Sequence, residues 1–537
     1  MKIARTASTT LLLLSSLLGA CDEPSDGDRA TDEEEDTEED GGDIDWPPRR
    51  DSGTTGGGSD GGTAEAGSDA STTRDASTPS GDGGVVSSLE TGGDCPTPTG
   101  PGTMHSQNIT GSETWTAAAS PHYLTSSITV EGTLTLEACA QVLLSKDVSL
   151  AVGSSGKPGG KLITQGTYEP EANGKPEVIK PVIFDSANDG EFWGSLLVYY
   201  QGEAEFHTTA LLHGGSVVGG YEGALAARGP NDGSLRRMIT AELLVVLESG
   251  GYGINLSSGA GFFETPDSSA TVLGAGRQPK PAGAARAPIY PVFVTPPGVG
   301  TLPPGQYFGS TEPELAENDK IYVYSARAIS ADEQFHNYGV PYLMEGTFYM
   351  RPPAATTTTL KIDPGVELRF HHDASSNASF QIGDGAPIDP RCVKLDIQGT
   401  AKDPIVFTSN AATPAAGDWM GLYLDCSPPS GNKLTNAYVL YAGGESGTNG
   451  YGCGPKDNDA AILITDWRPA DAFIQNVDIR DSAGGGIVSG WASNQAGPDL
   501  KTGNLFTRIA NGCSVSRWRT EEVNYCEGRT DEAPLCL

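Results

Sequence analysis

Short apolar triplets recur along the chain from residue 128 onward, separated by segments rich in glycine, proline and aspartate. They are ITV, LTL, VLL, VSL, LIT and VIF, and they begin at residues 128, 134, 142, 148, 162 and 182. A strand of three residues is too short to bury its apolar side without neighbouring strands. Residues 128 and 148, 142 and 162, and 162 and 182 are each twenty apart. This spacing predicts a solenoid of stacked coils, in which the first and third residues of each triplet point inward.

A longer phrase occurs twice. PVIFDSANDGEFWGSL at 181–196 is echoed by PIVFTSNAATPAAGDWMGLYL at 404–424, and other landmarks around the two phrases keep the same order at similar offsets. LLVVLESGGYGINL at 243–256 is echoed by FIQNVDIRDSAGGGIVS at 473–489, which sets Glu248 in register with Asp481. The chain therefore contains a whole module in duplicate.

The second copy carries the more regular motifs. KIDPGVELRF at 361–370, followed by DIQGTAKDPIVFTS and GDWMGLYL, resembles the right-handed parallel β-helix repeats of bacterial secreted and surface proteins with a pectin-lyase-like fold. The resemblance implies an all-β solenoid of two duplicated modules, over 101–275 and 321–510, and it places Asn436 and Asn476 in turn ladders that satisfy backbone groups. The first copy lacks the acid-proline-glycine turn and has TLEACAQVLLS instead.

The N-terminus has the pattern of an export signal. Lys2 and Arg5 precede a short leucine-rich core and small residues, a layout typical of a secretory signal peptide over 1–20. Residues 18–21, Leu-Gly-Ala-Cys, resemble the bacterial lipobox, which implies acylation of Cys21; the alternative is an ordinary signal peptide with a chance cysteine. Lipidation implies a cell-envelope location with the membrane as partner. We favour the outer membrane or cell surface over the inner membrane, although Asp22 disfavours outer-membrane transport in one well-studied sorting system.

Charge is concentrated after the signal. The chain has 69 acidic and 34 basic residues, a formal net charge of −35, which argues against binding nucleic acid through a broad basic face. Residues 22–94 hold 22 acidic and 4 basic residues, hence a net charge of −18, with few apolar side chains. Such a composition predicts a disordered acidic tether over 21–100.

Two further segments complete the predicted organisation. Residues 276–320 are rich in proline and glycine, which predicts an irregular connector, and we favour two packed modules over one continuous solenoid. Residues 511–537 are rich in cysteine and predict a stapled C-terminal cap. The exported chain has an even number of cysteines after Cys21, which predicts disulfides whose pairing is open: Cys95, Cys139, Cys392, Cys426, Cys453, Cys513, Cys526 and Cys536.

Catalytic motifs of polysaccharide-degrading β-helix enzymes are missing from the sequence. The Asn-Thr-Asp, Asp-Asp and Gly-His-Gly elements of polygalacturonase-type hydrolases do not occur. A lyase needs a base and a cation, such as calcium, that neutralises the uronate. The side chains available for that role are dispersed, and surface ion pairs are the alternative explanation for them: Arg236, Arg237, Arg369, Asp332, Glu333, Asp457 and Asp459.

Histidines offer little chemistry in this pattern. His213 precedes two glycines and is interpreted as a turn residue. His371 and His372 are adjacent, and neighbouring strand residues point to opposite faces, so we expect no shared metal ion. No resident cofactor is expected, with calcium as the one open possibility.

Aromatic side chains are the remaining candidates. Trp193, Trp419, Tyr199 and Tyr423 would stack on sugar rings if they align on one face, whereas the equivalent positions of both tryptophans favour packing at a turn. We therefore predict a non-catalytic lipoprotein with a β-helix ectodomain for adhesion, envelope architecture or glycan binding, with polysaccharide or other envelope proteins as partners. The alternatives are a calcium-assisted polysaccharide lyase, a glycoside hydrolase, and an interaction scaffold.

Overall fold

The computed structural model describes residues 82–537, apart from gaps at 155–158, 172–176, 218–222, 279–288, 310–316, 326, 374–375, 386–389, 446–458, 466, 491–496 and 518–534. The predicted signal peptide, Cys21 and the acidic segment up to residue 81 lie outside the described residues. In the part of the chain that is described, no helix is long and apolar enough to cross a membrane.

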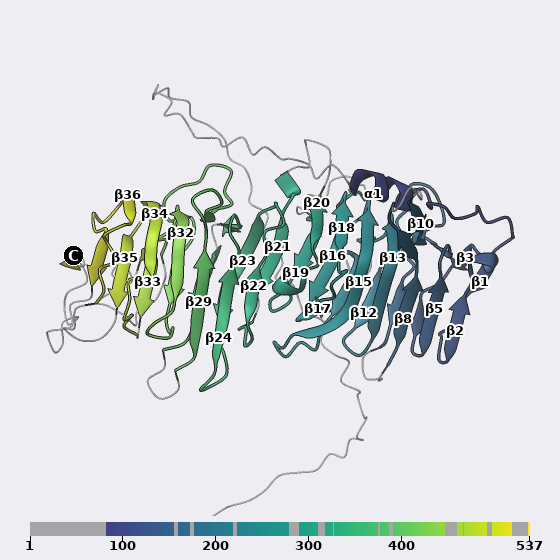
Figure 1. Ribbon diagram of the computed structural model, residues 1–537, viewed down its shortest axis with the longest axis horizontal. Coiled ribbons are helices and arrows are strands. Elements are labelled where there is room, and N and C mark those ends of the chain that lie inside the picture. Colours follow the sequence, from purple (N-terminus) through teal and green to yellow (C-terminus); the bar gives the residue numbers. More distant parts are fainter. Residues whose placement is uncertain are drawn as a thin grey trace, which may run out of the picture. The chain divides into compact units, whose positions relative to one another are not determined.

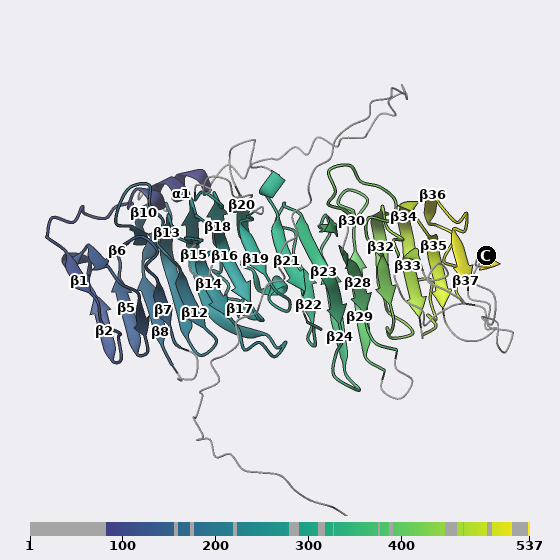
Figure 2. The ribbon, with the colours of Figure 1, turned by 180° about the vertical axis from the view of Figure 1, so that it is seen from behind.

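The chain rises in coils that contribute one strand to each of three ladders. It passes through β5 (Thr133–Glu137), β6 (Gln141–Leu144) and β7 (Leu150–Val152), and then through β8 (Lys161–Gln165), β11 (Val182–Ser186) and β12 (Leu196–Tyr199). β8 pairs in parallel with β5, β11 with β6, and β12 with β7. This is a parallel β-helix, so the predicted fold class is confirmed. Figures 1 and 2 show its strands side by side from β1 to β37.

One ladder of parallel strands, here called the long ladder, runs through both copies. Its strands, in order of pairing, are β4 (Ile128–Val130), β7, β12, β14 (Gly223–Arg228), β16 (Tyr252–Ser257), β19 (Val292–Val294), β21 (Ile321–Ser325), β23 (Tyr342–Met350), β25 (Glu367–Phe370), β30 (Ile405–Ser409), β32 (Lys433–Leu440), β34 (Ile474–Ser482) and β36 (Leu505–Ile509).

Two ladders belong to the N-terminal half. The first, called the covered ladder because helix α1 (Asp82–Glu90) packs on it, contains β1 (Thr103–His105), β3 (His122–Leu124), β6, β11, β13 (Glu203–Leu212), β15 (Arg236–Leu247), β18 (Ala270–Leu273) and β20 (Gly305–Phe308). The other contains β2 (Ser112–Trp115), β5, β8, the first halves of β13 and β15, and β17 (Ala260–Phe262).

Two ladders belong to the C-terminal half. One contains β22 (Glu333–Phe335), β24 (Thr357–Ile362), β29 (Cys392–Gln398) and the first halves of β32 and β34. The other contains the second half of β23, β28 (Ser379–Ile382), β31 (Leu422–Leu424), β33 (Ala460–Thr465), β35 (Gly485–Gly490) and β37 (Val515–Arg517).

A few short elements lie outside the parallel ladders. They are α1 (Asp82–Glu90), the 3-10 helices η1 (Ala117–Ala119) and η2 (Val299–Thr301), the antiparallel pairs β9 (Thr167–Glu169) with β10 (Val178–Lys180) and β26 (His372–Asp373) with β27 (Ser376–Asn377), and β38 (Leu535–Cys536), which pairs antiparallel with β37.

The core is one stack of inward side chains. Ile128 and Val130 are buried while Thr129 between them is partly exposed, as the alternation predicts. A single cluster of buried apolar side chains extends from Ile109 to Val515. The predicted spacing between coil partners is only partly right. Ile128 pairs with Leu150, close to the expected residue 148, whereas Leu162 pairs with Leu134 and not with residue 142, because the corners between strands differ in length.

The expected irregular connector at 276–320 is wrong where the structure describes it. β19 and β20 lie inside this segment and extend the long and covered ladders, and Val292, Val294 and Tyr307 join the common core. β19 pairs with β21, so the hydrogen-bonded ladder passes from one copy to the other without a break. Prolines at the corners leave the strand residues between them free to pair. The described coils therefore form one continuous solenoid, not two packed modules.

Strands that are equivalent in the two copies lie in different ladders, and we call this offset the shift of one face. β12, which follows Trp193, and β30, which precedes Trp419, belong to the same long ladder. The strand that follows Trp419, β31, lies in a different ladder. Equivalent strands of the two copies thus occupy neighbouring faces of the coil.

Local structure nevertheless confirms the duplication. Trp193 donates its Nε1 proton to the Leu212 carbonyl at 2.6 Å, and Trp419 donates to the Leu440 carbonyl at 2.8 Å. Beneath the tight turns, a Cβ added to Gly166 would lie 2.2 Å from the Thr208 carbonyl, and one added to Gly399 would lie 2.2 Å from the Asn436 carbonyl. Neither site has room for a side chain.

The predicted asparagine turns are present. Thr208 and Leu243 in the first copy, and Asn436 and Asn476 in the second, have φ between 42° and 59° and divide long strands into two ladders. Asn436 donates its Nδ2 proton to the Gly399 carbonyl of the preceding coil at 3.0 Å. Asparagine tolerates this left-handed conformation better than most residues.

Helix α1 and the residues that follow it lie before residue 101, so the predicted tether extends too far toward the C-terminus. Helix α1 packs against the outer side of the covered ladder (Figure 1), where Leu89 is fully buried against a patch that includes Ile183, Leu212 and Val245. Asp94 then accepts a hydrogen bond from the Ile179 backbone N–H at 2.7 Å. These outward apolar side chains are buried because the helix covers them.

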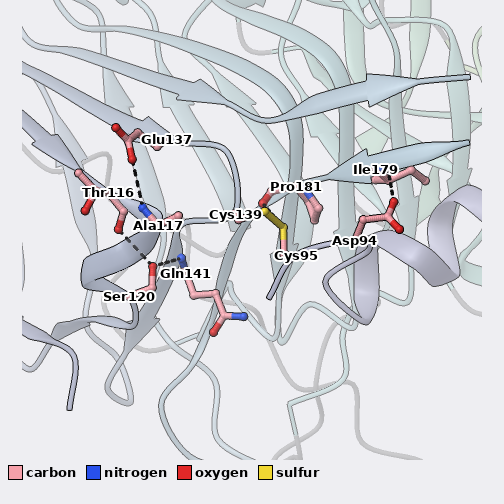
Figure 3. The surroundings of a disulfide bond; sticks show 10 residues. All are labelled: Asp94, Cys95, Thr116, Ala117, Ser120, Glu137, Cys139, Gln141, Ile179 and Pro181. Carbon is pink, nitrogen blue, oxygen red and sulfur yellow. Dashed lines mark hydrogen bonds between the residues drawn. A yellow bond between two sulfur atoms is a disulfide. The ribbon is translucent and has the colours of Figure 1, made fainter. Parts of the chain in front are cut away.

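Disulfides hold the described part at three places. Cys95 is bonded to Cys139 beside the end of α1 (Figure 3), Cys392 to Cys426, and Cys513 to Cys536. The last pair, together with β38, agrees with the predicted C-terminal cap. Cys453 and Cys526 lie outside the described residues.

Candidate functional site

The two tryptophans predicted as stacking platforms do not reach the surface. Trp193 and Trp419 are both fully buried at corners of the coil, and Trp419 stacks on Phe370 with ring centroids 4.0 Å apart. A sugar ring has no access to either indole. The structure therefore overturns the glycan-stacking role for both and agrees with packing at a turn.

The two predicted tyrosines lie apart from each other. Tyr423 is 7% exposed and packs with Leu463 and Val488 in a small apolar cluster on the outer side of β31, β33 and β35. Tyr199 is partly exposed at the end of β12, where its register partner is Arg228. Only Tyr199 therefore retains surface that a ligand reaches.

Where the structure describes them, the charged side chains considered for a lyase lie on different strands. Arg236 and Arg237 lie in β15 opposite β17, Glu333 lies in β22, and Arg369 lies in β25 of the long ladder. Asp459 is partly exposed next to β33, and Asp457 lies outside the described residues. Among the residues that the structure describes, no group of three or more His, Cys, Asp or Glu side chains is arranged to hold a metal ion.

Glu333 points into the core. Its Oε1 atom accepts hydrogen bonds from the backbone N–H groups of Gly300, at 2.8 Å, and Gln334, at 3.1 Å. Its Oε2 atom is buried and has no hydrogen-bond partner in the described part of the chain. Burial raises the pKa of this carboxyl to about 7. Its neighbour Asp332 instead accepts a hydrogen bond from the Thr359 backbone N–H at 2.7 Å.

The histidines occupy turns and strand ends. His213 has φ of 53° and its Nδ1 lies 2.8 Å from Asp185 Oδ1; this hydrogen bond raises the pKa of His213. The Nε2 atom of His372 lies 4.0 Å from Asp418 Oδ1, at the start of the β26–β27 hairpin. The turn interpretation of His213 agrees with the structure, and stacking of coils supplies a carboxylate partner that the linear sequence did not indicate.

A cluster of aromatic rings lies on the outer side of the long ladder, where the two copies meet. We call it the aromatic face and define it as Tyr252, Tyr290, Phe293, Tyr322 and Tyr324. Phe293 is its centre, with ring centroids 5.4 Å from Tyr252, 5.4 Å from Tyr322 and 6.4 Å from Tyr324. Tyr290 and Tyr322 are 5.3 Å apart.

Register explains why these rings meet. Asn255, Phe293, Tyr322, Leu343 and Arg369 are consecutive partners across β16, β19, β21, β23 and β25. The inward alternation that buries Val292, Val294, Ile321 and Val323 forces the residues between them outward. Parallel strands stack about 4.8 Å apart, so rings at matching positions of successive coils come close together. Phe293 and Tyr290 are largely buried, whereas Tyr252, Tyr322 and Tyr324 are partly exposed.

Charged groups border the aromatic face on its C-terminal side. Tyr322 donates its hydroxyl proton to Glu345 Oε2, and Arg369 Nε donates to Glu367 Oε1 at 2.6 Å. Burial, followed by the nearby Arg369, lowers the pKa of Lys320. Acidic and basic side chains therefore lie close together on adjacent coils, beside the aromatic rings.

Burial also raises the pKa of two tyrosine hydroxyls in the aromatic face. It raises the pKa of Tyr290 to about 12 and raises the pKa of Tyr322 further, with Glu345 adding to the effect. Both hydroxyls stay protonated at neutral pH, and that of Tyr322 donates its proton to Glu345. A surface of rings and neutral hydroxyls, with carboxylates at one side, is suited to binding and orienting sugar rings.

Sequence reasoning missed this cluster because its members are far apart along the chain. Tyr252, Phe293 and Tyr322 come from three successive coils, with corners of different length between them. A signal was present in the segments YPVFV at 290–294 and IYVYS at 321–325, where aromatic residues fill the outward positions of two strands. The segment 290–294 was not recognised as a strand because it lies within the predicted connector at 276–320.

Comparison with known proteins supports the fold. Residues 331–466 match the family model described as a pectate-lyase-like beta helix domain. This range holds the coils from β22 to the end of β33 and includes Glu345, Glu367 and Arg369. Neither a curated protein nor a solved structure matches the chain. In the matched range, the protein is similar to pectate-lyase-like β-helices.

Proposed function

We propose that this protein is a non-catalytic polysaccharide-binding lipoprotein of the cell envelope. In this proposal Cys21 carries the lipid anchor, the acidic segment holds the solenoid away from the membrane, and the aromatic face binds the glycan. The observation that carries the proposal is the aromatic face itself, because three partly exposed tyrosines border one buried ring on a rigid ladder.

The rigidity of the support favours a binding role. The rings project from β16, β19 and β21, whose inward neighbours belong to the continuous core. Side chains held in this way lose little conformational entropy when a ligand stacks on them, which lowers the free-energy cost of binding.

The distribution of charged side chains favours binding over cleavage. A retaining or inverting glycosidase needs two carboxyl groups facing each other across the scissile bond. Beside the aromatic face, Glu345 is engaged by the Tyr322 hydroxyl and Glu367 by Arg369. These contacts commit both carboxylates to neighbouring side chains instead of directing them at a common point. Polysaccharide lyase activity is the alternative that the experiment tests.

The test uses the full chain, purified with its disulfides intact. Affinity electrophoresis in gels that contain neutral or acidic polysaccharides measures binding, and an assay for reducing ends and unsaturated products measures cleavage. We expect retardation by at least one polysaccharide and no cleavage, with or without calcium. Cleavage of any polymer would replace the proposal with an enzymatic function, and calcium dependence would then point to a lyase.

Variants connect binding to the aromatic face. Tyr322→Ala and Tyr324→Ala each remove one ring, and we expect each to weaken binding about tenfold, which corresponds to about 1.4 kcal/mol. Tyr322→Phe keeps the ring and should bind nearly as well as the wild type. Tyr168→Ala removes an exposed tyrosine from the β9–β10 hairpin and serves as the matched control. Equal binding by all four variants would refute the assignment of the site.

A further inference from the structure

The charges beside the aromatic face compensate one another. Arg369 and Lys320 are its cations in the described coils, and Glu317, Glu345 and Glu367 are the acids that interact with them or with Tyr322. Arg369 is committed to Glu367 through the 2.6 Å contact of its Nε. The guanidinium therefore does not present an uncompensated positive charge to a ligand.

Lys320 is the second cation beside the rings. Its side chain is partly buried, and desolvation together with the nearby Arg369 lowers its pKa. A carboxylate on a ligand would meet Glu345 and Glu367 on the adjoining coils of the same ladder. Like charges held close together repel even in a solvated setting.

The described coils present no cluster of acidic, histidine or cysteine side chains arranged for a bridging cation. Calcium sites use several oxygen ligands arranged around one point. In the residues that the structure describes, no such group of three or more acidic, histidine or cysteine side chains occurs. At longer range, the formal net charge of −35 disfavours the approach of any polyanion.

The same groups suit an uncharged sugar. A carboxylate accepts more than one hydrogen bond, so Glu345 can accept from a sugar hydroxyl as well as from Tyr322, and the tyrosine rings offer apolar area for the C–H face of a pyranose. A hydrogen bond between a neutral hydroxyl and a carboxylate is stronger than one between two neutral groups. Carboxylates beside rings therefore favour hydroxyl-rich, uncharged ligands over uronates.

We infer, on the basis of the proposed polysaccharide-binding function, that the aromatic face selects neutral polysaccharides and rejects acidic ones. The inference rests on one row of register partners, in which two aromatic rings and Arg369 share the outer side of the ladder and Arg369 is paired with Glu367. The row consists of Phe293, Tyr322, Leu343 and Arg369.

The experiment compares two classes of polymer on the full chain. A neutral glucan and a galactomannan represent uncharged chains, and polygalacturonate and alginate represent uronates. We expect at least tenfold tighter binding of one or both neutral polymers at low salt. Tighter or equal binding of a uronate polymer would overturn the inference while leaving polysaccharide binding intact. Failure to bind any of the four polymers would instead refute the proposed function.

A charge variant tests whether the pairing of Arg369 with Glu367 causes the preference for neutral polymers. Glu367→Gln releases Arg369, and we expect it to raise uronate binding at least fivefold while neutral binding changes less than twofold. Asp384→Asn is the matched control, because it releases Arg351 from a contact of 2.7 Å on another part of the surface and changes the net charge by the same amount. Equal effects of the two variants on uronate binding would show that net charge, not the aromatic face, sets the preference, and would overturn the inference.

Discussion

The buried carboxyl of Glu333 gives the fold a measurable dependence on pH. Burial raises its pKa from 4.5 to about 7, so the folded protein binds this proton more tightly than the unfolded chain does. The sign follows from linkage. The favourable contribution is complete below about pH 4.5 and is lost as the pH rises through about 7. Above that pH the native state holds a buried carboxylate with one unpaired oxygen.

The size of the effect follows from the two pKa values. A tenfold change in proton affinity corresponds to about 1.4 kcal/mol, so the rise from 4.5 to about 7 corresponds to about 3 kcal/mol between pH 4 and pH 8. Glu333→Gln removes this titration while keeping an acceptor for the N–H groups of Gly300 and Gln334. We therefore expect the variant to be more stable than the wild type at pH 8 and similar or slightly less stable at pH 5.

Urea unfolding of both proteins at pH 5 and pH 8 measures this prediction. At each pH, the free energy of unfolding of the wild type is subtracted from that of the variant. The difference at pH 8 minus the difference at pH 5 is the quantity to compare, because the titration of the other acids is common to both proteins and cancels. Asp332→Asn is the control, because it removes a charge from the preceding residue, which is not buried in the core. A double difference below about 1 kcal/mol for Glu333→Gln would refute the reasoning.

Three further predictions concern packing. Leu89→Ala should cost about 3 kcal/mol locally and undock α1, since nine isolated residues do not hold a helix; faster proteolysis between 82 and 95 measures this, and unchanged proteolysis would contradict it. Replacing Cys95 and Cys139 together by serine opens a loop of 44 residues and should lower the free energy of unfolding by up to about 4 kcal/mol in denaturant titrations; no loss would show that the bond adds nothing. Trp193→Phe and Trp419→Phe each remove an equivalent buried hydrogen bond, so their unfolding costs should agree within about 1 kcal/mol, and a larger difference would argue against equivalent roles.

Strands and turns were predictable because they depend on local pattern. Alternation at Ile128 and Val130 marks an inward face wherever it occurs, and Asn436 sits where a left-handed turn requires it. Pairing between coils was less predictable, because it depends on how many residues each corner holds. A short segment brings Leu150 beside Ile128, whereas a much longer one separates Ile254 from Val292, its neighbour in the same ladder.

Covered and outward surfaces were the least predictable. Ile183 and Leu212 occupy outward positions, where alternation predicts exposure, yet α1 buries them from a segment that composition assigns to a disordered tether. Likewise, Trp193 stands out in the sequence although it is buried, whereas Phe293 and Tyr322 attract no notice until their strands stack. A linear pattern indicates which side chains alternate, and only the stacked coils show which outward ones meet.

The shift of one face between the copies limits how duplicated features meet a partner. The corner after Trp193 leads into the long ladder, whereas the corner after Trp419 leads out of it. The two corners therefore border the same ladder, one at the beginning of its strands and the other at their end. Duplication in this protein therefore repeats a local structure, the corner with a buried tryptophan, without repeating its position around the coil.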